Sequence, residues 1–349
     1  MNKIIFYAVP NLNQVSGGPK TRITQISKEI ERLGNKDIII GSKLTKLRLC
    51  LKAKKANIVY VESSTNRMGL IDLFCFIILK YKCRNFIVYI RDVYIQLFPN
   101  EYKRGRAYIT KVANIISNYI YYYFSDKLAF PTIEMGEVFI SSLNVTNTKP
   151  IFSLPPGTFN VAYTHTKESK VRAQKKLKNI NLLYLGGTKY IHSGFSSFLK
   201  LASELNCKYQ FHILTGDKLD DKILNSIKLN NIKILNLPHK KVIEYLEDED
   251  ITFVIHSRPK NNYDDITFPI KIMDCISCGV PIISYPHEPL IELLGFDYPF
   301  FVNEISSESI TEIMDNQSIS NLYEETIERL KVICNESSYI KQVEKIINS

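Results

Sequence analysis

The chain has 349 residues, enough for two domains of ordinary size, and its hydrophobic fraction of 45% and charged fraction of 23% are those of a globular protein. The formal net charge of +10 is uneven, because residues 1–160 hold 23 Lys and Arg against 10 Asp and Glu, whereas residues 161–349 hold 22 against 25. A basic first half fits a nucleic acid, an anionic membrane surface, or a solvated surface with no partner. The absence of a secretory signal or a membrane-spanning apolar run, and the seven scattered cysteines, predict a cytoplasmic protein.

Strands and helices alternate through the first half of the chain, which is typical of a parallel sheet with crossover helices. The predicted strands are Lys3–Val9, Asp37–Ile40, Asn57–Glu62, Phe86–Ile90, Lys127–Phe130 and Pro150–Leu154. The predicted helices are Thr21–Leu33, Lys43–Lys55, Arg67–Lys82 and Arg104–Phe124. Residues 1–160 are therefore expected to form one doubly wound, Rossmann-like domain.

A polar, Lys-rich segment, Thr158–Asn179, predicts the domain boundary, and a second alternating series follows it. The predicted strands are Leu182–Leu185, Tyr209–Leu214, Ile232–Leu235, Ile251–Ile255, Pro281–Tyr285 and Phe300–Val302. The predicted helices are Ser193–Leu205, Leu219–Leu229, Lys240–Glu247 and Pro269–Cys278, before a mostly helical tail with a break near 316–320. We predict a second Rossmann-like domain over residues 161–330 and a C-terminal helix over residues 331–349.

The stretch Ile251–His287 predicts a ligand site. It is read as a strand, a polar loop, a helix and a second strand, and ligands of open α/β sheets bind beyond the carboxyl ends of the strands. In the loop, Arg258 and Lys260 suit phosphate, and Asp264 and Asp265 suit hydroxyl groups. This combination predicts a ligand that carries both phosphate and hydroxyls.

The helix within this stretch carries a resemblance to a known family. Lys271 and Asp274 are three residues apart and share a helical face, so a cation lies beside a carboxylate. The segment FPIKIMDCISCGVPIIS resembles the donor-binding segment of family 4 glycosyltransferases, retaining enzymes of the GT-B fold, which reads roughly Pro-x-Lys-x-x-Glu-x-x-x-Cys-Gly-x-Pro-Val-Ile. The matching residues are Pro269, Lys271, Cys278, Gly279, Pro281 and Ile282. Asp274 takes the place of the glutamate that holds the donor ribose in the family, and Ile266 stands where the family often has another glutamate.

Two segments of the first half also fit this resemblance. Gly17-Gly18 lies between the first strand and a helix, where backbone amides suit a phosphate, although such a pair is often only a turn. In the family, the corresponding glycine loop faces the cleft between the domains, near the donor diphosphate. Arg91-Asp92 follows the strand Phe86–Ile90, and the resemblance implies that Asp92 lies beside the reacting hydroxyl of the acceptor. The alternative for Arg91-Asp92 is a structural pair at the end of a strand.

The first strand of the second half ends in Leu185-Gly186-Gly187-Thr188, which resembles the family's Gly-Arg-Leu segment. In the family, that arginine and a following lysine grip the diphosphate, but Gly187 and Ser193 stand at these positions here. The nearby residues that could replace these cations are Lys189, His192, Arg258 and Lys271.

Together these features predict a metal-independent, retaining glycosyltransferase of the GT-B fold, in which two Rossmann-like domains face each other and the C-terminal helix returns to the first. Developing charge on the departing diphosphate would be stabilised by cations, so neither a metal nor another cofactor is expected. The predicted catalytic residues are Asp92 and Lys271. The predicted donor-binding residues are Gly17, Gly18, Gly187, Lys189, Arg258, Asp265 and Asp274. The expected acceptor is lipid-linked or a polysaccharide, in the biosynthesis of O-antigen, capsule or exopolysaccharide.

Alternative functions remain open at this level. A sugar-nucleotide epimerase can share the architecture, and a non-catalytic nucleotide-sugar-binding scaffold would explain the missing cations. The Lys-rich segment Lys43–Lys55 and the basic and aromatic segment Arg104–Phe124 are candidates for contact with an anionic membrane surface, on its inner face, although a core helix also explains the second. No nucleic-acid-binding module is visible, so no nucleic acid is expected as a partner.

Overall fold

In the computed structural model of the protein, residues 3–15, 17–64, 67–146, 149–158, 176–189, 192–230 and 232–349 are described. The chain divides into two compact units. The first unit comprises Met1–Gly157, Ile266–Phe268 and Tyr339–Ser349, and the second comprises Thr158–Asp265 and Pro269–Ser338. Most of the predicted boundary segment, residues 159–175, lies outside the described residues.

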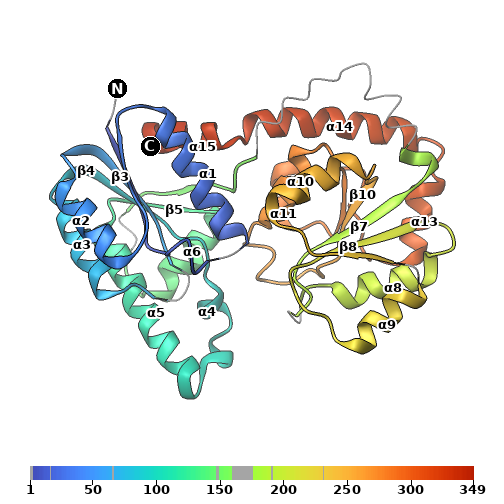
Figure 1. The fold of residues 1–349 in the computed structure, drawn as a ribbon, viewed down its shortest axis with the longest axis horizontal. Helices are drawn as coiled ribbons and strands as arrows, with labels where there is room; N and C mark the ends of the chain where they lie inside the picture. Colours follow the sequence, from blue (N-terminus) through green and yellow to red (C-terminus); the bar gives the residue numbers. More distant parts are fainter. Residues whose placement is uncertain are drawn as a thin grey trace. The chain divides into compact units, whose positions relative to one another are not determined.

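The first unit contains a six-stranded parallel sheet in the order β2-β1-β3-β4-β5-β6 (Figure 1). Its strands are β1 (Ile4–Ala8), β2 (Lys36–Ile39), β3 (Ala56–Glu62), β4 (Cys83–Tyr89), β5 (Lys127–Phe130) and β6 (Ile151–Ser153). Its helices are α1 (Gly18–Arg32), α2 (Lys43–Lys52), α3 (Leu70–Lys80), α4 (Tyr94–Leu97), α5 (Gly105–Phe124), α6 (Ile133–Ser142), α15 (Tyr339–Asn348) and the 3₁₀ helix η1 (Pro99–Tyr102). The six predicted strands are confirmed, whereas α4, η1 and α6 were not predicted.

Helices cover both faces of this sheet. Successive side chains of a strand point to opposite faces, and those of Ile5 and Tyr7 join a core cluster with residues of α2, α3, α5 and α6. Ile4 and Phe6 alternate with them and are equally buried. α1 packs against β1 and β2 and also against α15, so the last helix of the chain belongs to the layer around α1.

The second unit contains a five-stranded parallel sheet in the order β11-β10-β7-β8-β9. Its strands are β7 (Asn181–Leu185), β8 (Gln210–Leu214), β9 (Lys233–Leu235), β10 (Phe253–His256) and β11 (Ile282–Ser284). Its helices are α8 (Phe195–Leu205), α9 (Asp221–Leu229), α10 (His239–Asp248), α11 (Ile270–Ser277), α12 (Glu288–Leu294), α13 (Ser307–Asp315) and α14 (Ile319–Glu336). The prediction of a strand at Phe300–Val302 was wrong, because pairing there is limited to one bridge between Ser284 and Phe301.

Both sheets have the first strand of the unit inside the sheet and the later strands on both sides of it, which confirms the predicted doubly wound α/β class. The predicted break in the tail also exists, between α13 and α14, and a second break separates α14 from α15. Within the described part of the chain, no helix is both long enough and apolar enough to cross a membrane.

Candidate functional site

The second sheet reverses its strand order between β7 and β10, which pair in parallel. From this point β7 leads to β8 on one side and β10 leads to β11 on the other. Right-handed crossovers therefore place α8 and α11 on opposite faces, as Figure 1 shows. Ligands of open α/β sheets bind in the crevice at such a point. The described segments at this edge are 186–189 and 192–194 after β7, 215–220 after β8, and 257–269 after β10.

The start of α8 lies directly against the end of β10. Gly194 has a φ of +70°, and a Cβ there would lie 1.9 Å from the carbonyl oxygen of Ser257. Ser257 Oγ donates to the carbonyl of Gly194 at 2.8 Å and is buried. Only glycine permits this approach, because it has no side chain and adopts a positive φ without strain. The approach brings the segments after β7 and β10 together.

The loop after β7 is held by two side chains. The Tyr184 hydroxyl donates to the carbonyl of Gly187 at 2.5 Å, and burial raises the pKa of Tyr184 to about 12, which keeps the hydroxyl protonated. Asp217, after β8, accepts from the backbone N–H of Thr188 at 2.6 Å. This hydrogen bond, together with the nearby Lys189 ammonium, lowers the pKa of Asp217. An anionic ligand at this loop would therefore meet a carboxylate and needs cations close by.

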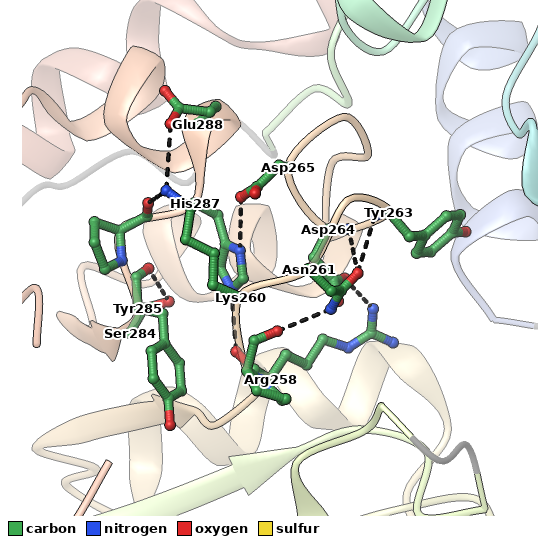
Figure 2. A network of polar contacts seen from close by, with 12 residues as sticks. Arg258, Lys260, Asn261, Tyr263, Asp264, Asp265, Ser284, Tyr285, His287 and Glu288 are labelled. Atoms are coloured by element: carbon green, nitrogen blue, oxygen red, sulfur yellow. Dashed lines mark hydrogen bonds and ion pairs between the residues drawn. The ribbon is translucent and has the colours of Figure 1, made fainter. Parts of the chain in front are cut away.

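Arg258 is oriented by an ion pair within the loop after β10 (Figure 2). Its Nη1 donates to Oδ1 of Asp264 at 2.6 Å, and Asp264 is 5% exposed whereas Arg258 keeps 31% of its side chain exposed. Asn261 donates from Nδ2 to the other Asp264 oxygen at 2.6 Å, and its Oδ1 accepts from the N–H groups of Tyr263 and Asp264. Asp264 thus holds the guanidinium in place and is not an open hydroxyl ligand.

The same loop is tied to the segment after β11, which Figure 2 also shows. The buried His287 ring contacts Asp265 Oδ1 from Nδ1 at 3.3 Å and the Arg258 carbonyl from Nε2 at 3.1 Å. Lys260 Nζ lies 3.3 Å from Glu288 Oε1 and donates to the carbonyl of Pro286. Asp265 and Lys260 therefore have protein partners, and His287 links both ends of the loop.

Lys271 and Asp274 lie on α11, and Asp274 is buried whereas Lys271 is exposed. The pKa of Lys271 is nevertheless lowered, first because surrounding protein removes water from the ammonium and then because the Arg258 guanidinium repels it. The carboxylates of Asp274 and Asp217 act in the opposite direction. Lys271 therefore interacts electrostatically with one cation and two carboxylates at the switch point.

The remaining predicted site residues belong to the first unit. Gly17 has a φ of +66°, is exposed, and caps α1 with no side chain over the first turn of that helix; Gly18 is the first helical residue. Asp92 follows β4, and its Oδ1 accepts from the N–H of Tyr94 at 2.8 Å at the start of α4. All three lie on segments that leave the carboxyl ends of strands in the first sheet. Gly187, Lys189, Arg258, Asp265, Lys271 and Asp274 lie at the corresponding edge of the second sheet.

Several residues of the site were not predicted. Asp217 has a sequence signal, since Thr215-Gly216-Asp217 directly follows an apolar strand and so lies at its carboxyl end. Asn261 and His287 have none, because their roles depend on contacts that form only in the folded loop. Among the described residues, no group of three or more His, Cys, Asp or Glu side chains is arranged to hold a metal ion.

No protein-family model matches the sequence, and no curated protein matches it either. Solved structures do match it over essentially their whole length. HepE from Anabaena in complex with UDP-glucose matches with a TM-score of 0.66 at 12% identity, over 100% of this chain and 99% of that one. Sucrose-phosphate synthase from Thermosynechococcus elongatus matches with a TM-score of 0.62 at 10% identity, over 99% and 98% of the two chains. A glycosyltransferase from Rickettsia africae ESF-5 matches with a TM-score of 0.63 at 13% identity, over 99% and 97%.

The chain has the GT-B fold. This confirms the predicted architecture, because glycosyltransferases of that fold match both halves of the chain in one alignment. Identities this low establish the fold and leave membership of family 4 as a prediction.

Proposed function

We propose that this GT-B protein is a retaining glycosyltransferase that moves a sugar from a nucleotide-sugar donor to a lipid-linked or polysaccharide acceptor in the assembly of a cell-surface polysaccharide. The observation that carries the proposal is the gathering of Arg258, Lys271, Asp217 and Asp274 at the switch point of the second sheet. Cations there suit a diphosphate and a buried carboxylate suits ribose hydroxyls. The full-length likeness to a structure that holds UDP-glucose supports the same reading.

The proposed roles follow the chemistry of a departing diphosphate. Arg258, Lys271 and Lys189 would balance its negative charge, because charges that are already in place stabilise the charge that develops in the transition state. Gly187 would let the backbone approach the phosphates, and Asp274 would accept from the ribose hydroxyls. Asp265 would position the donor from the loop after β10, which its contact with His287 helps to hold.

In the first unit, Gly17 and Gly18 would add backbone N–H groups at the start of α1, a helix of 15 residues whose N-terminus favours anions. Asp92 would support the reacting hydroxyl of the acceptor. Lys271 would act directly on the leaving group as a cation, so we assign it a catalytic role together with Asp92. In this proposal the cations do the work of a metal ion.

The test is incubation with a panel of sugar nucleotides, with and without a lipid-linked or polysaccharide acceptor, and with and without EDTA. Release of nucleotide only with acceptor, unaffected by EDTA, supports metal-independent transfer. Interconversion of the sugar without nucleotide release would instead identify an epimerase. Binding of a donor without either reaction would identify a non-catalytic scaffold. The observation that favours a scaffold is Gly187, which stands where the resemblance places an arginine.

A further inference from the structure

Two helices of the first unit expose continuous apolar stripes. On α3 and its C-cap residue Tyr81, the residues Leu70, Phe74, Ile77 and Tyr81 follow one another at intervals of four, three and four, which is one side of a helix. Phe74 is 61% and Tyr81 84% exposed. On α5, the exposed apolar residues are Tyr108, Ile109, Val112, Ile115, Ile116 and Tyr123. We call these ten residues the apolar face.

The two stripes lie in one layer of the unit. α3 packs beside both α2 and α5, and the buried sides of all three helices contribute to the same core cluster on one face of the first sheet. Figure 1 shows these helices together on that side of the sheet. Their opposite sides therefore point away from the sheet, and the apolar face lies on the outside. Scattered apolar residues are normal on protein surfaces, but a continuous set on two neighbouring helices marks an interaction site.

The charges around the apolar face are mostly positive. Residues 43–124 hold 15 Lys and Arg against four Asp and Glu. Helices α2, α3 and α5, all of whose residues are described, contain one acidic residue, Asp72, and its carboxylate is buried in an ion pair with Lys46. The exposed cations on and beside these helices are Lys43, Arg48, Lys52, Lys54, Lys55, Arg67, Arg84, Lys103, Arg104 and Arg106.

We infer that the apolar face docks the first unit on an anionic lipid bilayer, with α3 and α5 lying in the plane of the interface. Leu, Ile and Phe side chains would enter the boundary between headgroups and acyl chains, and the surrounding Lys and Arg would contact anionic headgroups. Tyr81, Tyr108 and Tyr123 suit the same boundary, because their rings are apolar and their hydroxyls polar. A protein partner fits the apolar face less well, because helices α2, α3 and α5 expose no carboxylate with which the cations of a partner could pair.

α2 contributes to this surface mainly through its charges. The spacing of leucines and cations made Lys43–Lys55 a candidate for contact with a membrane surface. In the structure Leu47, Leu49 and Cys50 face the core, and only Leu44 and Leu51 of the α2 leucines are exposed. α2 would therefore supply cations, whereas α3 and α5 supply the side chains that insert.

The experiment is flotation of the full chain with vesicles of phosphatidylcholine alone or mixed with phosphatidylglycerol, without any donor or acceptor. We expect binding to the mixed vesicles that weakens with salt. The double variant Phe74→Ser/Ile116→Ser should bind at least about tenfold more weakly, because two inserting side chains become polar. The matched control is Phe296→Ser in the second unit, where Phe296 is 88% exposed, and it should bind like the unchanged protein.

Two results would overturn the inference. One is equal vesicle binding by the double variant and the unchanged protein, with unaltered melting temperatures showing that both are folded. The other is self-association in solution that the double variant abolishes, which would make a second copy of the chain the occupant of the apolar face. Because the measurement needs no nucleotide sugar, its outcome is independent of the proposed glycosyl transfer.

Discussion

Asp264 holds the guanidinium of Arg258 at 2.6 Å while lying buried at the base of the loop between β10 and α11. The two side chains differ in exposure. The Asp264 carboxylate is buried, whereas 31% of the Arg258 side chain remains exposed to solvent. A buried carboxylate that anchors a half-exposed cation is an arrangement for presenting that cation to a ligand. In the proposed donor site the ligand would be a diphosphate.

We expect Asp264→Asn to raise the KM for the nucleotide sugar roughly tenfold with little change in kcat, because Arg258 loses a charged hydrogen bond of about 1.5–3 kcal/mol that orients it. The matched control is Asp297→Asn, which breaks another 2.6 Å pair with an arginine, Arg329, in the same unit but outside the site. An equal KM effect from both variants would contradict a specific role for the Arg258 pair.

Asp274→Ala should weaken binding of the nucleotide sugar about tenfold or more, since a buried carboxylate that accepts from ribose hydroxyls contributes roughly 1.5–3 kcal/mol. Isothermal titration calorimetry measures this directly. Ser277→Ala serves as the control, because Ser277 is equally buried on α11 and donates to the carbonyl of Met273. Unchanged affinity in Asp274→Ala would show that the ribose lies elsewhere.

The lowered pKa of Lys271 predicts a pH dependence of donor binding. The ammonium is charged below its pKa, so its contribution is present at pH values below that lowered pKa and is lost as the pH rises through it. Titration of UDP affinity in the alkaline range should show this loss. Lys271→Arg should remove it, because a guanidinium stays protonated there, and every other titrating group is shared by the two proteins. Parallel curves for the two proteins would mean that Lys271 does not contact the phosphates.

Gly194→Ala should destabilise the second unit by about 2–4 kcal/mol, because the new Cβ meets the Ser257 carbonyl and the positive φ disfavours alanine. Thermal denaturation followed by circular dichroism checks the effect. Gly216→Ala is the matched control at the same edge of the sheet, where a Cβ would have no neighbour within 4 Å, and we expect a change within about 0.5 kcal/mol. Similar melting temperatures for both variants would show that the approach of α8 to β10 is not rigid.

Acid should destabilise the second unit through His212. Burial and, to a smaller extent, the nearby Lys233 ammonium lower the pKa of His212 from an ordinary 6.5 to about 4. Between these values the unfolded state binds the proton more strongly, so stability is complete above pH 6.5 and falls by up to about 3 kcal/mol as the pH drops to 4.

Urea denaturation at several pH values measures this slope, to which His256 also contributes, because burial lowers its pKa as well. His212→Gln should make the slope smaller whatever its effect on absolute stability. Lys233→Gln should also reduce it, since removal of the cation raises the pKa of His212 in the folded protein. A slope that neither variant alters would exclude His212 as its source.

The alternation of short apolar runs predicted most of the strands because each run is bounded by turn residues. It could not predict α6, whose ten residues include Gly136, a poor helix former. The structure explains that glycine, since a Cβ there would lie 2.9 Å from the ring of Phe130. Close packing against β5 requires it, and packing of this kind is invisible in a local pattern.

The sequence predicted the region in which the candidate site lies, but not the contacts between its residues. Position at strand ends located Arg258, Lys271 and Asp274 because the edge of a parallel sheet is fixed by topology. The same reasoning offered Asp264 as an open ligand, which the structure corrects: its oxygens are taken up by Arg258 and Asn261. Such pairing depends on the turn that the loop adopts, and no spacing rule specifies it.

The packing of α15 against α1 links the two extremes of the chain order within one unit. Tyr339, Val343 and Ile346 are buried in α15, and all of the second unit is translated before them. Most of the first unit therefore leaves the ribosome long before its core can be completed. Until α15 is made, α1 lacks the helix against which it packs. The second unit is complete at Ser338 and is free to fold first, so synthesis from the N-terminus and folding would run in opposite orders.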